Sequence, residues 1–133
     1  MTSQSKPKVY LVGTGGSISF VGRTRTDYTN YSYDGKHLTI DELLARVPEV
    51  QGFAGVQAEQ FLKLGSTDVT PEHWLNLAKR INQILQEDPE VAGVAITHGT
   101  ATLEETAYFL NLTVKSSKPV VVTCAMRPPT GLG

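Results

Sequence analysis

The sequence is poor in cysteine, has no large excess of charge of either sign, and lacks a long hydrophobic run. Its one cysteine, Cys124, excludes an intrachain disulfide and a zinc site built on several cysteines. Because Cys124 lies among apolar neighbours in 120–126, we expect a buried, inert thiol. Twelve basic and thirteen acidic residues give a net charge of −1, which favours neither nucleic acid nor an anionic membrane as a partner.

Further absences narrow the class of protein. No apolar run has the length needed to cross a membrane, and the polar segment 1–8 lacks the apolar core of a secretory signal, so we expect a cytoplasmic protein. The three histidines, His37, His73 and His98, show no spacing with carboxylates that is typical of a metal site, and we expect neither metal nor cofactor. What is present, 40% hydrophobic and 19% charged residues in a chain of 133, is typical of a soluble globular domain.

The chain alternates between apolar runs typical of buried strands and patterns typical of amphipathic helices. This alternation predicts an α/β fold with a three-layer, mostly parallel, doubly wound sheet. The expected strands are 9–12, 56–64, 91–96 and 120–124, and the expected helices cover 40–47, 71–85 and 102–112.

Capping signals mark the helix starts. The expected caps are Thr39 (in a capping box with Glu42), Thr70 (before Pro71 at the first helical position) and Thr102 (in a capping box with Glu105). The buried stripe expected on the second helix consists of Trp74, Leu77, Ala78, Ile81 and Leu85.

Two segments are expected to be irregular. Residues 21–36 are polar and indicate a long loop, which in a compact domain is often a functional lid. Residues 128–133 also have loop composition. A strand as apolar as 120–124 needs cover on both faces, and only three helices are expected in the chain. We therefore expect residues 1–133 to form one incomplete domain, the N-terminal portion of a larger protein.

Two turns that follow expected strands carry hydroxyl side chains, Gly13–Ile18 and Thr97–Thr100. Ligands bind at the carboxyl ends of strands in open α/β sheets, so these turns indicate a site. Ser17 is either a nucleophile or the capping serine of a tight turn. Thr100 is either a ligand-binding hydroxyl at a helix N-terminus or a simple turn threonine. His98, two residues before Thr100, is expected to be a structural hydrogen-bonding residue.

Other interpretations of these turns have less support. A dinucleotide fingerprint fails because Ile18 stands at the third glycine position, and no Gly-Lys-Ser/Thr sequence indicates a P-loop. Glu104 and Glu105 are adjacent on a helix, so they point in different directions and do not form an acid/base pair. The tyrosines of the long loop either supply a phenol to the site or pack the loop down: Tyr28, Tyr31 and Tyr33.

With these turns in view, the chain resembles the N-terminal domain of bacterial L-asparaginases and glutaminase-asparaginases. Thr14–Ile18 is similar to the first signature of that family, usually Thr-Gly-Gly-Thr-Ile. Residues 96–107 are similar to the second signature, which usually has aspartate where this chain has Ala101. Residues 118–128 are similar to the next strand and turn of the family, and the resemblance covers nearly the whole chain.

The resemblance implies an amidohydrolase that converts L-asparagine, L-glutamine or a related amide to the acid and ammonia through an acyl-enzyme. It implies that Ser17 is the nucleophile, Tyr31 the loop tyrosine that activates it, and Thr100 a second catalytic hydroxyl. Substrate-binding positions are implied at Ser66, Thr67, Gly16, Gly99 and Ala101. It also implies a homo-oligomer, a tetramer or a dimer. The alternative is a degenerate, non-catalytic homologue that binds a small ligand.

Two departures from the family pattern bear on this expectation. The aspartate that Ala101 replaces pairs with the α-ammonium of the substrate, and losing such a contact to a buried charge costs about 2–5 kcal/mol. Ala101 therefore implies a different primary amide, a carboxylate from elsewhere, or a weakened enzyme. In the family, the lysine that activates the second threonine, the smaller C-terminal domain and the subunit contacts all lie beyond the part that this chain matches.

Overall fold

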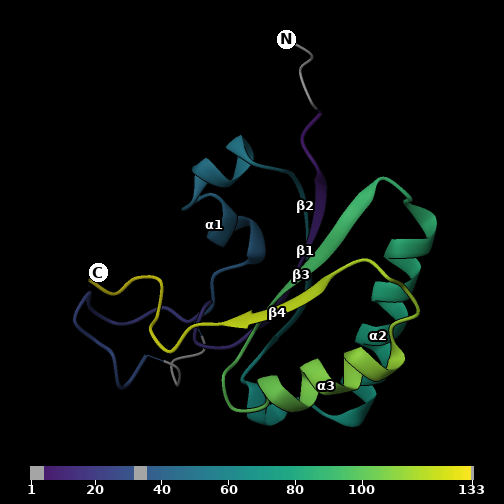
Figure 1. Cartoon of the computed structure of the whole chain (residues 1–133). Coiled ribbons are helices and arrows are strands. Elements are labelled where there is room, and N and C mark those ends of the chain that lie inside the picture. The colour runs from purple at the N-terminus through teal and green to yellow at the C-terminus, as the bar shows by residue number, and fades with distance from the viewer. Residues whose placement is uncertain (1–4, 32–35, 133) are drawn as a thin grey trace.

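The computed structural model describes residues 5–31 and 36–132. Four parallel strands form one sheet in the order β2–β1–β3–β4 (Figure 1). They are β1 (Lys8–Gly15), β2 (Gly55–Leu64), β3 (Val91–His98) and β4 (Val120–Cys124). The predicted parallel α/β sheet is confirmed. Its strand order reverses between β1 and β3, which is where open sheets of this kind bind ligands.

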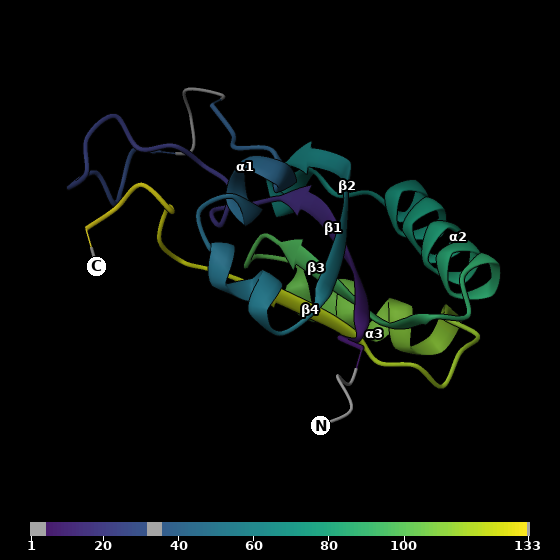
Figure 2. The same ribbon diagram turned by 90° about the horizontal axis from the view of Figure 1, so that it is seen from above.

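Helices cover both faces of the sheet. Helices α2 (Pro71–Glu87) and α3 (Leu103–Thr113) lie on one face, whereas α1 (Ile40–Leu44) and the 3-10 helix η1 (Pro48–Gly52) lie on the other (Figure 2). The predicted three-layer arrangement is thus confirmed. None of the helices among the described residues has the length and apolarity needed to cross a bilayer.

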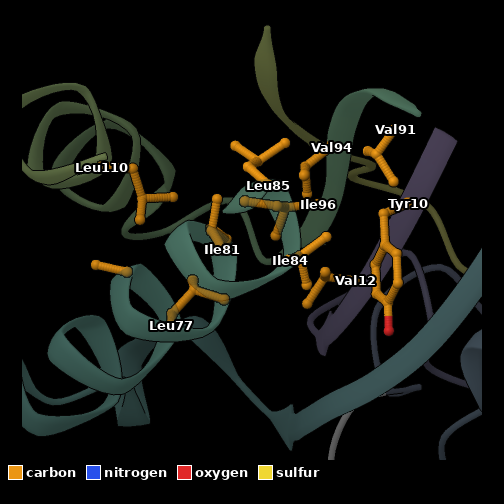
Figure 3. Packing of buried hydrophobic residues seen from close by; sticks show 11 residues of the cluster. Tyr10, Val12, Leu77, Ile81, Ile84, Leu85, Val91, Val94, Ile96 and Leu110 are labelled. Carbon is orange, nitrogen blue, oxygen red and sulfur yellow. The ribbon is translucent and has the colours of Figure 1, made fainter. Parts of the chain in front are cut away.

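The hydrophobic core lies between the sheet and the layer formed by α2 and α3. Tyr10 and Val12 of β1, with Val94 and Ile96 of β3, pack against this layer (Figure 3). The side chains that meet them from α2 and α3 are Leu77, Ala78, Ile81, Ile84, Leu85 and Leu110. Complete burial of one aliphatic side chain contributes roughly 1.5–3 kcal/mol. Core packing therefore holds β1 and β3 in register, and so places the two turns at their carboxyl ends.

Two of the three predicted helix caps are confirmed. Thr39 forms the capping box of α1, and Thr70 caps α2, where His73 completes an additional box through its Nδ1. The third prediction is wrong. Thr102 precedes α3 but makes no side-chain cap, because its hydroxyl donates to the carbonyl oxygen of Ser66 at 2.8 Å. A contact between distant segments takes the hydroxyl that a local cap needs.

Several element boundaries differ from those predicted. Helix α1 ends at Leu44, and the chain then turns into η1 instead of continuing to residue 47. Strand β3 continues through Thr97 and His98, which were expected in its exit turn. On α2, Ile84 is buried and Trp74 only partly so, which shifts the predicted stripe toward the C-terminal half of the helix.

Strand β4 is covered unevenly. Val121 is 55% exposed, whereas Val120 and Val122 pack against the core. Cys124 is partly buried, whereas a buried thiol was predicted from its apolar neighbours, so the burial prediction is wrong. The apolar character of this strand thus exceeds what the described part of the chain covers.

Candidate active site

Three turns meet at the carboxyl edge of the sheet, one after each of β1, β2 and β3. Together with the loop that follows β1, they surround a cavity of about 480 Å³. All eight residues that the sequence assigns to a site line this cavity: Gly16, Ser17, Tyr31, Ser66, Thr67, Gly99, Thr100 and Ala101. The structure therefore brings together residues from four separate segments, while their chemical roles stay predictions.

Glycine is required where these turns touch. Gly15 and Gly16 have φ angles of +107° and +81°, in the region that side chains disfavour. A Cβ atom on Gly16 would lie 2.3 Å from the Cα of Gly99, and one on Gly15 would lie 2.3 Å from the carbonyl oxygen of Leu64. The amide of Gly16 also donates to Leu64 at 2.9 Å. Backbone contact, which only glycine permits, thus sets the spacing between the turns.

Ser17 and Tyr31 are in hydrogen-bonding contact. The hydroxyl oxygen of Tyr31 lies 3.2 Å from Ser17 Oγ and 3.1 Å from the carbonyl oxygen of Met126. A phenol has one proton and a carbonyl oxygen can only accept. Both contacts are satisfied together when Tyr31 donates to Met126 and Ser17 donates to Tyr31. In that arrangement the serine proton already points at the phenol oxygen.

Ser66 connects the turn after β2 to the turn after β3. Its buried Oγ accepts from the amide of Ala101 at 3.0 Å, and its carbonyl oxygen accepts from Thr102. Because Ser66 Oγ acts as the acceptor there, its own proton is available to a ligand in the cavity. Next to this contact between the two turns, Thr100 and Ala101 are exposed and line the cavity.

The charges that line the cavity are few. In the described lining, Lys63 and Asp68 carry the formal charges, and both are exposed. Burial, and then the charge of Lys63, lower the pKa of His37 below its ordinary 6.5, so its imidazole is neutral at pH 7. Ala101 contributes a methyl group. Within residues 5–31 and 36–132, no cluster of His, Cys, Asp and Glu side chains could hold a metal ion.

Several residues that line the cavity were not predicted from the sequence, among them Phe20, Thr29, His37, Lys63 and Asp68. Phe20 and His37 pair in an isolated antiparallel bridge, and their rings meet edge to face at 4.4 Å. No spacing in the sequence signals this contact, because the two residues flank a long irregular loop. Only the position of Asp68, directly after Ser66 and Thr67, was a usable local signal.

Other candidate residues lie away from the cavity lining. The hydroxyl of Tyr28 donates to the carbonyl oxygen of Leu132 at 2.6 Å, and Tyr33 falls outside the described residues. His98 is 1% exposed and both of its ring nitrogens are hydrogen-bonded, as expected of a hydrogen-bonding residue. Glu104 and Glu105 lie in the first turn of α3 and do not line the cavity.

A second cavity, of about 510 Å³, lies between α1 and the sheet. It is lined mainly by apolar side chains, including Val9, Leu11 and Leu43. Ser17, Tyr31 and Thr100 do not line it. The first cavity is therefore the candidate for hydroxyl chemistry.

Comparisons with known proteins relate the chain to one family. Residues 8–133 match the family model described as "Asparaginase, N-terminal". The chain is 45% identical to L-asparaginase 2 of Bacillus subtilis over 95% of this chain and 33% of that protein. It is 46% identical to a probable periplasmic L-asparaginase of Haemophilus influenzae, over 93% of this chain and 34% of that protein. A glutaminase-asparaginase of Acinetobacter glutaminasificans is 41% identical over 96% and 38%.

A solved structure has the same fold. The probable cytoplasmic L-asparaginase from Campylobacter jejuni superposes with a TM-score of 0.85 and 41% identity. The match covers 97% of this chain and 37% of that one. The chain thus spans about a third of the length of the relatives that it matches.

Proposed function

The chain belongs to the asparaginase family, and from this premise we propose that the protein containing it is an amidohydrolase that releases ammonia from the side-chain amide of L-asparagine or a related compound. The observation that carries the proposal is the contact between Ser17 Oγ and the Tyr31 hydroxyl inside the cavity. A serine whose proton is directed at another oxygen is poised to attack a carbonyl carbon.

The first half-reaction forms an acyl-enzyme. Ser17 Oγ attacks the amide carbon, and its proton passes to Tyr31 as the phenol gives up its own proton to the departing nitrogen. The carbon–nitrogen bond then breaks and ammonia leaves. The amides of Gly16 and Ala101 are already used within the protein, so other N–H groups of these turns would meet the developing oxyanion.

The second half-reaction is hydrolysis of the ester. A water attacks the acyl carbon and gives one proton to the Tyr31 hydroxyl, which passes its own proton to Ser17 Oγ as the ester carbon–oxygen bond breaks. Thr100, exposed in the same cavity, is proposed as the second catalytic hydroxyl, which orients this water. No cofactor is required by either step, since the first transfers the acyl group from nitrogen to the serine oxygen and the second from that oxygen to water.

Substrate binding is proposed for the turn after β2. Ser66, whose proton is free to donate, and Thr67 would hold the carboxylate end of the substrate, with the charge of Lys63 in the same wall. Gly16 and Gly99 allow close approach of the substrate to the backbone. Ala101 would contact the end that carries the α-nitrogen.

Assembly and location belong to the same proposal. We expect a homo-oligomer, a tetramer or a dimer, in which parts outside this chain complete the site. Among the relatives, one is described as cytoplasmic and another as periplasmic. The cytoplasmic location expected from the sequence is proposed here for this protein as well.

The test is ammonia release by the full-length protein, supplied with L-asparagine and with L-glutamine. Ser17→Ala should lower kcat by more than about 1,000-fold, because the nucleophile is removed. Tyr31→Phe should lower it by about 100-fold or more, through loss of proton transfer. Tyr28→Phe is the matched control, since its hydroxyl binds Leu132 instead of Ser17, and should keep wild-type kcat. Undiminished turnover by Ser17→Ala would remove Ser17 from the mechanism.

One observation favours a second function. Ala101 places a methyl group in the cavity, and the single carboxylate in the described lining, Asp68, is exposed. A non-catalytic homologue that binds a small ligand fits such a weakened pocket. Calorimetry that detects L-aspartate binding in full-length protein without any amide turnover would support this function over the enzyme.

A further inference from the structure

A buried histidine stands directly before the turn that carries Thr100. His98 is the last residue of β3, is 1% exposed, and is followed at once by Gly99 and Thr100. Its ring does not line the cavity. Any influence of this ring on the site must therefore pass through its hydrogen bonds.

Those hydrogen bonds form a chain with one possible direction. Trp74 Nε1 can only donate, and it lies 2.8 Å from Thr106 Oγ1. Thr106 therefore accepts there, and its own proton can be donated to His98 Nε2 at 3.0 Å. The carbonyl oxygen of Gly99, 2.8 Å from Nδ1, can only accept, so Nδ1 of the neutral ring carries the proton and Nε2 accepts from Thr106. The acceptor-only carbonyl of Gly99 thus fixes the histidine tautomer, and the donor-only indole leaves the Thr106 proton for Nε2.

The surroundings keep the ring neutral and fixed. Burial lowers the pKa of His98, against the opposing effect of its bond to Gly99, so the imidazole is uncharged at pH 7. Thr106 on α3 is fully buried, and the Trp74 ring on α2 stacks on Phe109 at a centroid distance of 5.7 Å. The two helices lie on the same face beside β3 (Figure 1). The hydrogen-bond chain therefore joins α2 and α3 to the end of β3.

The last bond in the chain orients a peptide of the site. The Gly99 carbonyl and the Thr100 amide belong to one planar unit, so holding the oxygen fixes the direction of the amide N–H. There is no room for adjustment around Gly99. A Cβ there would lie 2.6 Å from Ser66 Oγ, and one on Gly16 would lie 2.3 Å from the Gly99 Cα. Rotation of this peptide would therefore displace Ser66 and the turn that carries Ser17.

We propose that His98 is a positioning residue, which acts with Thr106 and Trp74 to hold the Gly99–Thr100 peptide in its working orientation. The proposal rests on the amidohydrolase function only for its kinetic readout. His98 does not need to contact the substrate, because its ring acts through the carbonyl of Gly99. A purely structural role predicts lower stability with unchanged turnover, whereas a positioning role predicts a loss of kcat.

The kinetic test uses two amides that each replace one end of the imidazole, in the full-length protein. In His98→Asn the amide nitrogen takes the place of Nδ1, so the bond to Gly99 is retained; Thr106 can then donate to the Thr102 carbonyl within its own helix. In His98→Gln the amide takes the place of Nε2, and the bond to Gly99 is lost. We expect kcat of His98→Gln to be about tenfold below that of His98→Asn, with KM within about twofold. Equal or reversed kcat values would overturn the proposal.

Thr106 supplies a second pair that keeps the test decisive if the histidine variants fold poorly. Thr106→Ser keeps both the donor and the acceptor and should retain wild-type kcat. Thr106→Val has nearly the same shape without the hydroxyl, and should lower kcat by several-fold. A Thr106→Val protein with a lower Tm but unchanged kcat would show that the hydrogen bonds from Trp74 to Gly99 have only a structural role.

A readout independent of activity separates this proposal from the proposed function. In full-length protein labelled with ¹⁵N-histidine, and with the signal assigned through His98→Gln, the ring nitrogens should report a neutral Nδ1–H tautomer. The Nε2–H tautomer or an imidazolium would overturn the hydrogen-bond chain. If wild-type protein shows the neutral Nδ1–H tautomer but hydrolyses no amide, the proposed function fails while the hydrogen-bond chain stands.

Discussion

At the scale of single residues, Ala101 is the position at which the proposed site presents a methyl group to the substrate. Its amide is fixed by Ser66 Oγ at 3.0 Å, and its methyl group lies at the exposed side of the cavity. A free amino acid brings an ammonium group, which needs an acceptor or a carboxylate. In the described lining, Asp68 is the one carboxylate, and it lies on an exposed turn. The charge balance at this position therefore decides how well an α-ammonium is held.

Replacing Ala101 with aspartate should improve the use of free L-asparagine. The backbone there is held by Ser66, so a carboxylate enters at a fixed point beside Thr100. We expect kcat/KM for L-asparagine to rise roughly tenfold in Ala101→Asp, about 1.4 kcal/mol, which is modest because the position is exposed. Steady-state ammonia release by the full-length protein measures it.

Ala101→Asn is the matched control, since it adds the same volume without the charge. A gain common to both variants would assign the effect to shape, and no gain in either would mean that another group binds the ammonium. The same comparison made with an amide that lacks an α-ammonium should show no benefit from the aspartate.

At the scale of the elements, the sequence was informative wherever the cause of structure was local. Thr39 and Thr70 cap their helices as predicted, because the groups they satisfy lie within three residues along the chain. Thr102 has the same local signal, but its hydroxyl bonds to Ser66, 36 residues away. The glycine turns were recognisable in the sequence. The part of the cavity lining formed by Phe20 and His37 was not, because it arises from a bridge between residues on either side of a loop.

The turn after β1 provides the prediction at this scale. A Cβ on Gly16 would stand 2.3 Å from the Gly99 Cα, on a backbone with φ of +81°. Relieving that clash requires the turns after β1 and β3 to separate. We expect Gly16→Ala to destabilise the full-length protein by more than about 2 kcal/mol and to remove most amide turnover.

Gly52→Ala is the control for this substitution, because nothing lies within 4 Å of the Cβ it would add. Thermal unfolding and ammonia release measure the two effects. Gly16→Ala protein with the Tm and kcat of wild type would show that the turns are not held by this contact. A loss shared by Gly52→Ala would point to a general effect of added side chains.

At the scale of the whole molecule, the layers are held together unequally. One face of the sheet is closed by the core under α2 and α3 (Figure 3), whereas the other has the apolar cavity beside α1, and Val121 on β4 stays 55% exposed. The well-packed side is also the one from which Trp74 and Thr106 reach His98. The well-packed side of the molecule is thus connected, through His98 and Gly99, to the turn that bears Thr100.

A polar network fastens the same two layers at another point. Glu59 of β2 accepts from Arg80 of α2 at 2.6 Å and from the hydroxyl of Tyr10 of β1 at 2.8 Å. The hydrogen bonds from Arg80, and then that from Tyr10, hold the pKa of the Glu59 carboxyl below its ordinary value of 4.5, against the effect of burial. The network also raises the pKa of Arg80, so the guanidinium stays charged at every pH of interest.

This network predicts how stability depends on pH. A carboxyl whose pKa is lowered in the folded state stabilises that state above the unfolded-state pKa, and the contribution is lost as the pH falls through the folded-state value. Glu59→Gln should therefore lower the free energy of unfolding by about 1 kcal/mol at pH 7, a figure reduced by partial exposure of the pair. The difference from wild type should shrink toward zero as the pH falls below 4.5. Glu90→Gln, at an exposed position, should change stability little at any pH. Because Glu59 joins two strands to a helix, a Glu59→Gln deficit that persists undiminished in acid would mean that shape, and not the charge on this carboxyl, connects the layers.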